Sequence, residues 1–552
     1  MRARPASRPE DAPLRLITPG AGVETDISPR AAALLLLGAL AVGSLVRASF
    51  VLSSGFPLND GGMFVAMVRD LQASAYRLPA FTSYNAEHLP FAYPPLGFYL
   101  AGVLNDLTGA SLTQVLRFVP LACSALAVPA FYLLAREMLR TRQAVAVAVW
   151  LFAFLPASIA WMIMGGGLTR APGYLFAILT LSAVRRMYRR RTASSALLVV
   201  VVSSLAVLSH LEMAWFAAIS AAVFLLAFGR DRRSLVLTAA AAAGVAALTA
   251  PWWLTVVIQH GPGPFLAAAS STSSSPWQPL TLLVQFGVTG ETLFALTGAL
   301  ALLGIAACLA TRQYLLPSWL LALAVFDQRG FRTSATVVVA LLAAVAVCDV
   351  VLPLAAKWSL PSSLASSARH GPRGAPRWLA PAMLALALAY PAFSVLATPS
   401  KVLTGMSTDE RAAMAWVRTN TPPAARFVVV SGDAWSVDRT SEWFPVLAGR
   451  RSLATVQGTE WLPGGAYHRR IRQYQTLQDC AVADAACLAS WSAGSGERFD
   501  DVYIPRLSPR ADTTSGAPCC APLIAALRAD PRYAVLYDGP GAVVFAHLAA
   551  GG

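Results

Sequence analysis

Ionisable side chains gather in the long segment between the first two apolar runs of the chain. Asp60 stands in LNDGG (58–62), just past the first run, and Glu87 with His88 follows in YNAEHLP, shortly before Tyr93. Carboxylates and imidazoles are the side chains that transfer protons and that ligate divalent metal ions. Two plainer interpretations stay open: Asp60 caps the helix that follows it, and Glu87 and His88 are solvated loop residues.

A second pair, His210 and Glu212, lies in LSHLEMAW between two strongly apolar runs, where a plain hairpin turn needs no ionisable group. Imidazole and carboxylate together suit zinc or manganese, so these two residues and Glu87 are candidate ligands of a divalent metal ion. They could equally contact a polar substrate, or satisfy each other at the helix ends. The sequence therefore leaves the metal requirement open.

Three arginines stand in short polar turns, away from the main basic clusters. Arg170 lies in GGGLTRA (165–171), whose glycines let the backbone approach a ligand closely, and Arg329 and Arg332 lie in FDQRGFR. Charge in or near a hydrocarbon layer is costly and tends to be functional. The alternative is that each guanidinium extends to the lipid headgroups.

The elements that must position these residues are apolar. Of the 552 residues, 56% are hydrophobic and 13% are charged, about half the charged fraction of a soluble domain. Such a chain needs lipid around it, which excludes a soluble globule, a disordered chain and a collagen-like chain. The sequence predicts a polytopic α-helical membrane protein with about eleven transmembrane helices, near 31–52, 113–135, 144–164, 168–184, 194–209, 212–228, 234–258, 292–310, 313–326, 333–354 and 378–397.

Basic residues predict how these helices cross the membrane. With the N-terminus inside, the alternating cytoplasmic segments hold 21 of the 28 basic residues that precede residue 401. Positive charge favours the cytoplasmic side, so this bias indicates a multi-pass protein of the plasma membrane. It places a disordered tail (1–30) in the cytoplasm and gives a transmembrane domain over 31–399. The first large loop (53–112) and a soluble domain (400–552) then lie outside.

The exported part of the chain has the pattern of a small α/β domain. A helix is expected from Ser407 to about Arg418, a buried strand over 427–431, and two paired strands in YAVLYDGPGAVVFAH. Its acidic and basic residues nearly balance, and it has no basic face interleaved with aromatic residues. Nucleic acid is therefore not an expected partner.

Four of the seven cysteines, Cys480, Cys487, Cys519 and Cys520, fall in this domain. Disulfides persist outside the cytoplasm, and the Cys-x6-Cys spacing matches no common zinc site, so disulfide bonds are expected. Four cysteines allow three pairings, and the sequence does not choose among them.

Several short motifs, taken in their order along the chain, resemble the polytopic glycosyltransferases of the C superfamily (GT-C). They are LNDGG after the first span, AYPPLGFYL at 92–100, GGGLTRA, SHLE at 209–212, and DERAAMAWVRTNTPPAARFVVVSGD with SEWFPVLAGRRS in the external domain. Similar members include protein O-mannosyltransferases, the lipid A aminoarabinose transferase and the catalytic subunit of oligosaccharyltransferase. The likeness covers the whole chain in architecture and these motifs in detail.

The resemblance implies a membrane glycosyltransferase that takes a sugar from a polyprenyl-phosphate donor in the lipid and passes it to an external acceptor, whether glycan, lipid or protein. Asp60 matches the family's first-loop acid and is expected to be the base. Many relatives have two adjacent acids there, whereas this chain has Asn59 beside Asp60. The side chains expected to bind substrate or its phosphate are Arg170, Arg329, Arg332, Glu87, His88, Tyr93, His210 and Glu212.

Two other functions stay open. A secondary transporter or lipid flippase usually carries ionisable residues in mid-span, whereas here the polar groups cluster at one membrane face. A catalytically silent relative would use the external domain as a binding module. The sequence names neither the sugar nor the acceptor, and a divalent metal cofactor stays a hypothesis.

Overall fold

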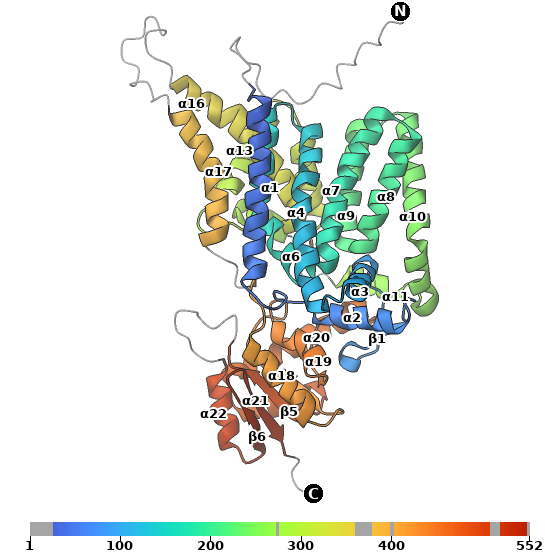
Figure 1. The fold of residues 1–552 in the computed structure, drawn as a ribbon, viewed down its shortest axis with the longest axis vertical. Coiled ribbons are helices and arrows are strands. Elements are labelled where there is room, and N and C mark those ends of the chain that lie inside the picture. Colours follow the sequence, from blue (N-terminus) through green and yellow to red (C-terminus); the bar gives the residue numbers. More distant parts are fainter. Residues whose placement is uncertain are drawn as a thin grey trace, which may run out of the picture.

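The structure is a computed structural model that describes residues 26–271, 275, 277–358, 378–397, 402–507 and 519–548. A bundle of helices forms one end of the molecule, and a smaller domain that contains a β-sheet forms the other end (Figure 1). The helical bundle and the C-terminal α/β region confirm the predicted fold class. Most of the predicted tail (1–30) lies outside the described residues.

The apolar runs of the sequence form the helices of the bundle. Seven described helices are long and apolar enough to cross a membrane: α1 (Pro29–Leu52), α4 (Leu112–Met138), α7 (Gly167–Arg190), α9 (Leu211–Phe228), α10 (Arg232–His260), the helix Phe331–Ala356, and α17 (Leu379–Ala397). An eighth candidate is α5 (Arg142–Phe154) together with Pro156–Ile163, a pair bent by 72°. Shorter apolar helices are α8 (Ala193–Ser209), α13 (Leu296–Ala310) and α14 (Leu315–Phe326). Each predicted run overlaps one of these segments, while the number that cross a membrane stays a prediction.

Short helices complete the bundle. Residues 156–163 contain η3 (Pro156–Ser158) and α6 (Ala160–Ile163). α15 (Phe331–Val345) continues through η5 (Ala346–Val351) into α16 (Leu352–Trp358). Between α10 and α13 lie α11 (Gly263–Ser270), α12 (Gln278–Val284) and η4 (Gly287–Thr289).

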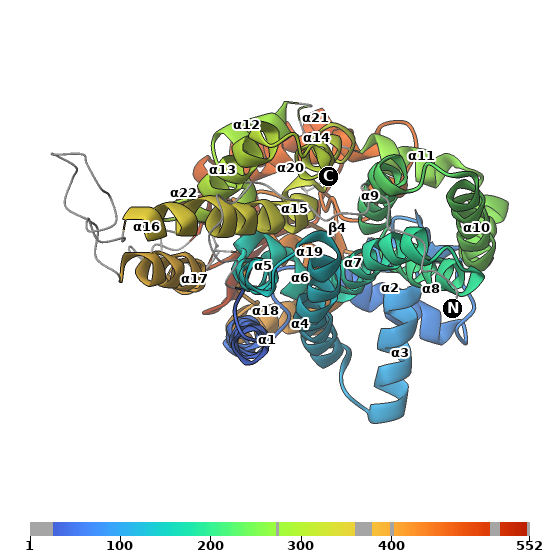
Figure 2. The ribbon, with the colours of Figure 1, turned by 90° about the horizontal axis from the view of Figure 1, so that it is seen from above.

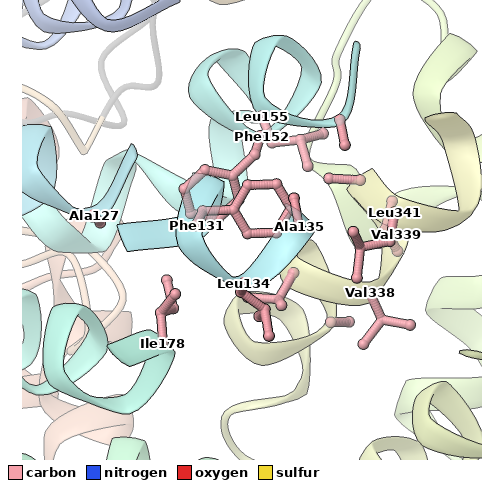
Figure 3. Close-up of a cluster of buried hydrophobic side chains, with 14 of the residues drawn as sticks. Ala127, Phe131, Leu134, Ala135, Phe152, Leu155, Ile178, Val338, Val339 and Leu341 are labelled. Atoms are coloured by element: carbon pink, nitrogen blue, oxygen red, sulfur yellow. The ribbon is translucent and has the colours of Figure 1, made fainter. Parts of the chain in front are cut away.

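A buried apolar core between α4, α5, α7 and α15 holds the bundle together. Phe131 and Phe152 stack with their ring centroids 4.2 Å apart. Figure 3 shows Leu134, Ile178 and Val338 around these rings, from three different helices. All five side chains are fully buried, and burying a side chain of this size contributes about 1.5–3 kcal/mol. This core fixes the relative positions of the helix ends that carry the candidate site residues.

The first long loop folds into helices and a small hairpin. It contains α2 (Gly62–Ala73), β1 (Phe81–Thr82), η2 (Tyr84–Ala86), β2 (Leu89–Pro90) and α3 (Leu96–Thr108), with β1 and β2 antiparallel. Seen from above, α3 projects away from the bundle (Figure 2). Its side chains Leu100, Val103 and Leu107 are exposed, as is usual for a helix that lies at a lipid surface.

The C-terminal domain is built on one mixed sheet of five described strands, in the order β4-β3-β5-β7-β6. β4, β3 and β5 are parallel, whereas β7 is antiparallel to both of its neighbours. Ser407 caps the first helix by accepting a hydrogen bond from the Glu410 N–H at 3.1 Å. The elements in order are α18 (Thr408–Asn420), β3 (Arg426–Val429), α19 (Arg439–Leu447), β4 (Arg451–Ser452), η7 (Thr459–Trp461), α20 (Ala466–Gln478), η8 (Asp479–Val482), α21 (Ala485–Ser495), β5 (Asp501–Pro505), α22 (Ala521–Ala529), β6 (Tyr533–Asp538) and β7 (Ala542–His547).

The four cysteines of this domain form two disulfides, which the sequence left undecided. Cys480 is bonded to Cys487, with the Cα atoms 5.5 Å apart, and Cys519 is bonded to its neighbour Cys520. Both pairs lie in the core beside the sheet. They connect η8 to α21 and fix the turn that precedes α22.

The first loop docks the C-terminal domain onto the bundle through buried polar contacts. Glu87 forms an ion pair with Arg470 of α20 at 2.8 Å, and its side chain is 5% exposed. Asn85 donates to the Ser452 carbonyl at 2.8 Å and accepts from the Ser452 N–H at 2.7 Å. An isolated buried charge costs several kcal/mol, so Glu87 and Arg470 each need the other in place.

Candidate functional site

Asp60 lies between α1 and α2, and its carboxylate is held by the turn that precedes α7. The Gly166 N–H donates to Asp60 Oδ1 at 2.7 Å, and the Gly165 N–H donates to the Leu58 carbonyl at 2.9 Å. LNDGG and GGGLTRA therefore touch, although Asp60 and Gly166 are 106 residues apart in the chain.

Glycine is needed on both sides of this contact because the two backbones nearly touch. A Cβ atom at Gly165 would overlap the Asp60 carbonyl, and one at Gly166 would overlap the Asp60 carboxylate. Gly61 has φ +124°, a conformation that L residues rarely adopt. The local sequence thus fixes the direction of the Asp60 side chain through close packing.

A second carboxylate, that of Glu442, reaches the same segment from α19 of the C-terminal domain. Its Oε1 atom accepts the Gly61 N–H at 2.9 Å, across 381 residues of chain. The side chain is 4% exposed. Glu442 therefore caps the N-terminus of α2, where backbone N–H groups point outward and favour a negative or strongly accepting group.

The neighbours of Glu442 and Asp60 strengthen this junction. The Trp443 ring Nε1–H donates to the Asn59 carbonyl at 3.1 Å. The Asn59 N–H in turn donates to the Thr404 carbonyl at 2.9 Å. Asn59 thus anchors the backbone beside Asp60, and an acid, Glu442, reaches the same segment from the C-terminal domain.

The two carboxylates have raised pKa values because both are taken out of water. Burial raises the pKa of Asp60, while the Gly166 N–H and the charge of Arg170 act in the opposite direction. Burial first, and then the charge of Asp60, raise the pKa of Glu442 well above its usual range. Like charges that act on each other do not ionise together easily, so the two carboxyl groups release their protons in separate steps.

Arg170 follows Gly166 by one turn at the start of α7 and forms the opposite side of the site. Its guanidinium lies over the Trp161 ring, 5.2 Å from the centroid. Its Nε and Nη1 atoms are buried and have no hydrogen-bond partner among the described residues. A buried guanidinium with free donors is expensive unless an acceptor joins it.

His210 lies beside Arg170. Its Cβ packs where Gly173, one turn further along α7, has no side chain. Its Nδ1 atom is buried and is also without a partner in the described part of the chain. Burial, followed by the charges of Arg170 and Arg329, lowers the pKa of His210 well below its usual value. The imidazole is therefore neutral at physiological pH.

Arg329 completes the polar cluster from the turn before α15. Its Nε lies 3.5 Å from Glu212 Oε2, and its Nη1 donates to Ser271 Oγ at 2.9 Å. Glu460 of η7 lies near enough for the charge of Arg329 to act on it, and burial raises the pKa of Glu460. The sequence did not point to Glu460 or Glu442, because the residues around each acid do not indicate which part of the bundle it contacts.

Tyr93 lies at the centre of this cluster. Its ring is 6.4 Å from His210 and 5.3 Å from Trp461, centroid to centroid. Burial raises the pKa of Tyr93, and the charges of Glu460 and Arg170 act on it in opposite directions. The structure therefore brings together six predicted residues: Asp60, Tyr93, Arg170, His210, Glu212 and Arg329.

Three other predicted site residues point elsewhere. The Glu87 carboxylate is engaged by Arg470 at the domain junction instead of by the surroundings of Asp60. His88, at φ +50°, lies beside Phe81 with ring centroids 6.0 Å apart. The guanidinium of Arg332 extends toward Gly290, next to Pro156 of η3. Their contact with substrate stays a prediction.

The predicted metal ligands His210, Glu212 and Glu87 are likewise separated, because Glu87 faces the C-terminal domain. Among the described residues there is no group of three or more His, Cys, Asp or Glu side chains that could hold a metal ion. The donor set therefore does not fit the site that the sequence suggested.

An apolar groove of about 490 Å³ opens at the side of the bundle, between α3, the end of α8 and α10. Leu78, Leu208 and Trp252 line it, and Arg77 stands at its edge. The same three apolar residues also pack in one cluster with Tyr93 and Trp461. The groove thus runs from the lipid-facing side of the bundle to the edge of the polar cluster.

Three solved structures have a similar fold. ArnT from Cupriavidus metallidurans in the apo state gives a TM-score of 0.54 at 16% identity, over 94% of this chain and 98% of that one. The archaeal oligosaccharyltransferase AglB from Archaeoglobus fulgidus, in complex with an inhibitory peptide and a dolichol-phosphate, gives 0.52 at 15% identity, over 85% and 69%. The arabinofuranosyltransferase AftD from Mycobacteria gives 0.53 at 16% identity, over 95% and 40%.

These likenesses confirm the predicted fold, that of the GT-C glycosyltransferases. ArnT bound to undecaprenyl phosphate is similar as well, with a TM-score of 0.51 at 15% identity, over 95% of this chain and 99% of that one. Residues 91–275 match a family described as a 6-pyruvoyl-tetrahydropterin synthase related domain and membrane protein. No curated protein matches the chain in sequence.

Replacing Gly165 with alanine is expected to separate the two motifs that hold Asp60. The new Cβ would overlap backbone, which cannot move aside as a side chain can, so we expect a loss of about 1–3 kcal/mol in the free energy of unfolding. Thermal unfolding of the purified protein measures this as a lower midpoint. Gly55→Ala is the matched control, because that glycine of the same loop has no heavy atom within 4 Å of the added Cβ. Equal midpoints for the two variants would contradict the contact.

Stability against pH tests the protonated state of Glu442. An acid whose pKa is raised on folding stabilises the protein at low pH and loses this contribution as the pH rises through its folded pKa. We therefore expect the midpoint of Glu442→Gln, which keeps an acceptor for the Gly61 N–H, to fall less than that of the wild type as the pH rises above about 4.5. Asp479→Asn is the control, since this acid of the same domain is exposed. Parallel curves for wild type and Glu442→Gln would show that Glu442 titrates as an ordinary carboxyl.

Proposed function

We propose that this protein is a glycosyltransferase that moves a sugar from a polyprenyl-phosphate donor to an acceptor on the external face of the plasma membrane. The observation that carries the proposal is that Gly166, one helical turn before Arg170, holds the Asp60 carboxylate, while buried guanidinium atoms of Arg170 have no hydrogen-bond partner among the described residues. A base beside an anion-binding group is what transfer from a phosphate leaving group needs.

The position of the donor follows from the apolar groove. A polyprenyl chain in the membrane would enter between α3, α8 and α10 and place its phosphate beyond Trp252, near Tyr93. Arg170 would bind the phosphate oxygens with its planar fork, and the neutral His210 would donate or accept a further hydrogen bond. The likeness to ArnT with undecaprenyl phosphate and to AglB with a dolichol-phosphate supports this choice of donor.

The proposed reaction is a single displacement with inversion at the sugar carbon. The acceptor hydroxyl gives its proton to an Asp60 carboxylate oxygen while its own oxygen forms the new bond to the anomeric carbon. The bond from that carbon to the phosphate oxygen breaks, and its electron pair leaves with the polyprenyl phosphate. Positive charge at Arg170 stabilises the leaving group as its negative charge grows.

The remaining residues of the cluster would position the reactants. Glu442, together with Trp443, holds the backbone on either side of Asp60. Glu212 holds Arg329, and Glu460 presents an acid toward the same space. Divalent metal dependence stays a proposal of the sequence alone, and no step above is routed through a metal ion because the described residues do not gather three ligands.

Turnover of a polyprenyl-phosphate sugar by the purified protein tests this function. Asp60→Asn is expected to reduce transfer at least about 100-fold while the protein still folds, since general-base catalysis contributes about 10²–10⁴-fold. Asp106→Asn, an exposed acid on α3 of the same loop, is the matched control and should retain wild-type turnover. Transfer is measured as radioactive sugar moved to the acceptor. Wild-type turnover by Asp60→Asn would remove the proposed mechanism, and transport without transfer by the wild type would favour a flippase.

A further inference from the structure

A second cavity lies between α4, α7 and α8. The ends of α4 and α7 that line it, and the start of α8, lie at the end of the bundle away from the C-terminal domain (Figure 1). It has a volume of about 210 Å³, and we call it the arginine pocket after its four arginines, Arg136, Arg186, Arg189 and Arg190. The other polar residues of its lining are Glu137 and Ser182. No part of the proposed transfer reaction uses these residues.

The distance along α7 places this pocket at the opposite membrane face from Asp60. Arg170 and Arg189 are nineteen positions apart in the chain, and an α-helix rises about 1.5 Å per residue, so the two lie ~29 Å apart along the helix axis. The hydrocarbon core of a bilayer is about 30 Å thick. A ligand in the arginine pocket would therefore be at the level of the headgroups on the far leaflet.

The charge of the pocket is not balanced by the protein. Its four arginines face one carboxylate, Glu137, which is engaged by Arg189 at 2.8 Å. Within the described ranges, Arg186 and Arg190 have no carboxylate at ion-pair distance. Arg136 has a cation–π contact with Tyr132, at 6.0 Å. The pocket thus offers guanidinium donors that match the oxygens of a phosphate group.

The rest of the lining is apolar, which favours a lipid over a free anion as the ligand. Leu133, Leu179, Leu198 and Val202 form the wall toward the membrane interior. Leu133 and Leu198 are each 41% exposed, so acyl chains can lie against them. A cavity that is basic at the headgroup level and apolar above it complements a phosphate carried on acyl chains, and basic pockets between transmembrane helices commonly bind such headgroups.

We propose that the arginine pocket binds an anionic phospholipid of the leaflet opposite the candidate active site, with its phosphate held by Arg186, Arg190 and Arg136. The proposal does not depend on the transfer reaction. The lipid would fasten the ends of α4, α7 and α8 together, at the far end of the helix whose start holds Asp60 and Arg170.

Calorimetric titration of the full-length protein in neutral detergent micelles tests this site. The probes are phosphatidylglycerol, phosphatidylcholine and inorganic phosphate. The wild type is expected to bind phosphatidylglycerol in preference to the other two. Arg186→Gln combined with Arg190→Gln should weaken this binding about tenfold or more for each arginine removed.

The matched control is Arg232→Gln combined with Arg233→Gln. These arginines begin α10 and do not line the pocket, yet the change removes the same charge from the same end of the bundle. It should leave phosphatidylglycerol binding unchanged. Equal losses in both double variants would overturn the proposal in favour of general surface charge, and equal binding of inorganic phosphate would overturn the lipid assignment.

A charge-conserving variant distinguishes a loss of lipid binding from a loss of folding. Arg186→Lys combined with Arg190→Lys keeps the positive charge that helps to orient the helices, and loses the planar fork that binds phosphate through two hydrogen bonds. Its affinity for phosphatidylglycerol should fall severalfold. Wild-type affinity in this variant would count against a guanidinium–phosphate site.

Discussion

The structure depends on one constraint: the Asp60 carboxylate must be held in a fixed direction at the point where the chain leaves its first membrane helix. The short segment around Asp60 cannot fix its position alone, so two distant parts of the chain form hydrogen bonds with it. The glycine turn before α7 binds its side chain, and Glu442 with Trp443 binds the backbone beside it. The bundle and the C-terminal domain are therefore both needed for the orientation of one side chain.

Much of the fold could be predicted from the sequence because its signals are local. Each apolar run forms helix, although the run 144–164 is divided into two parts bent by 72°, and the hairpin at the C-terminus forms where YAVLYDGPGAVVFAH predicts it. The sequence also indicates that Asp60 lies near Arg170. The glycines at 165–167 have no side chain, so another backbone can approach them closely. The number of helices that cross the membrane stays a prediction, because length and hydropathy alone do not decide it for the shorter ones.

The rest of the site could not be predicted, because it is made by residues that meet only in the folded chain. Glu442 contacts Gly61 across 381 residues, and nothing in SEWFP indicates which acid turns toward the bundle. Glu87 is a second case. The sequence offered it as a substrate-binding residue or metal ligand, whereas in the structure its carboxylate is paired with the half-buried Arg470 of the C-terminal domain. The partner of a charged loop residue is thus set by the surface that packs against the loop. The local sequence carries no information about that surface.

The most direct test of the account is the affinity of the purified protein for a polyprenyl phosphate without sugar. If the unpartnered donors of Arg170 hold the lipid phosphate, Arg170→Gln should raise the dissociation constant about 10- to 100-fold. Arg332→Gln, whose side chain extends toward Gly290, should change it little. Unchanged affinity in Arg170→Gln would contradict the account.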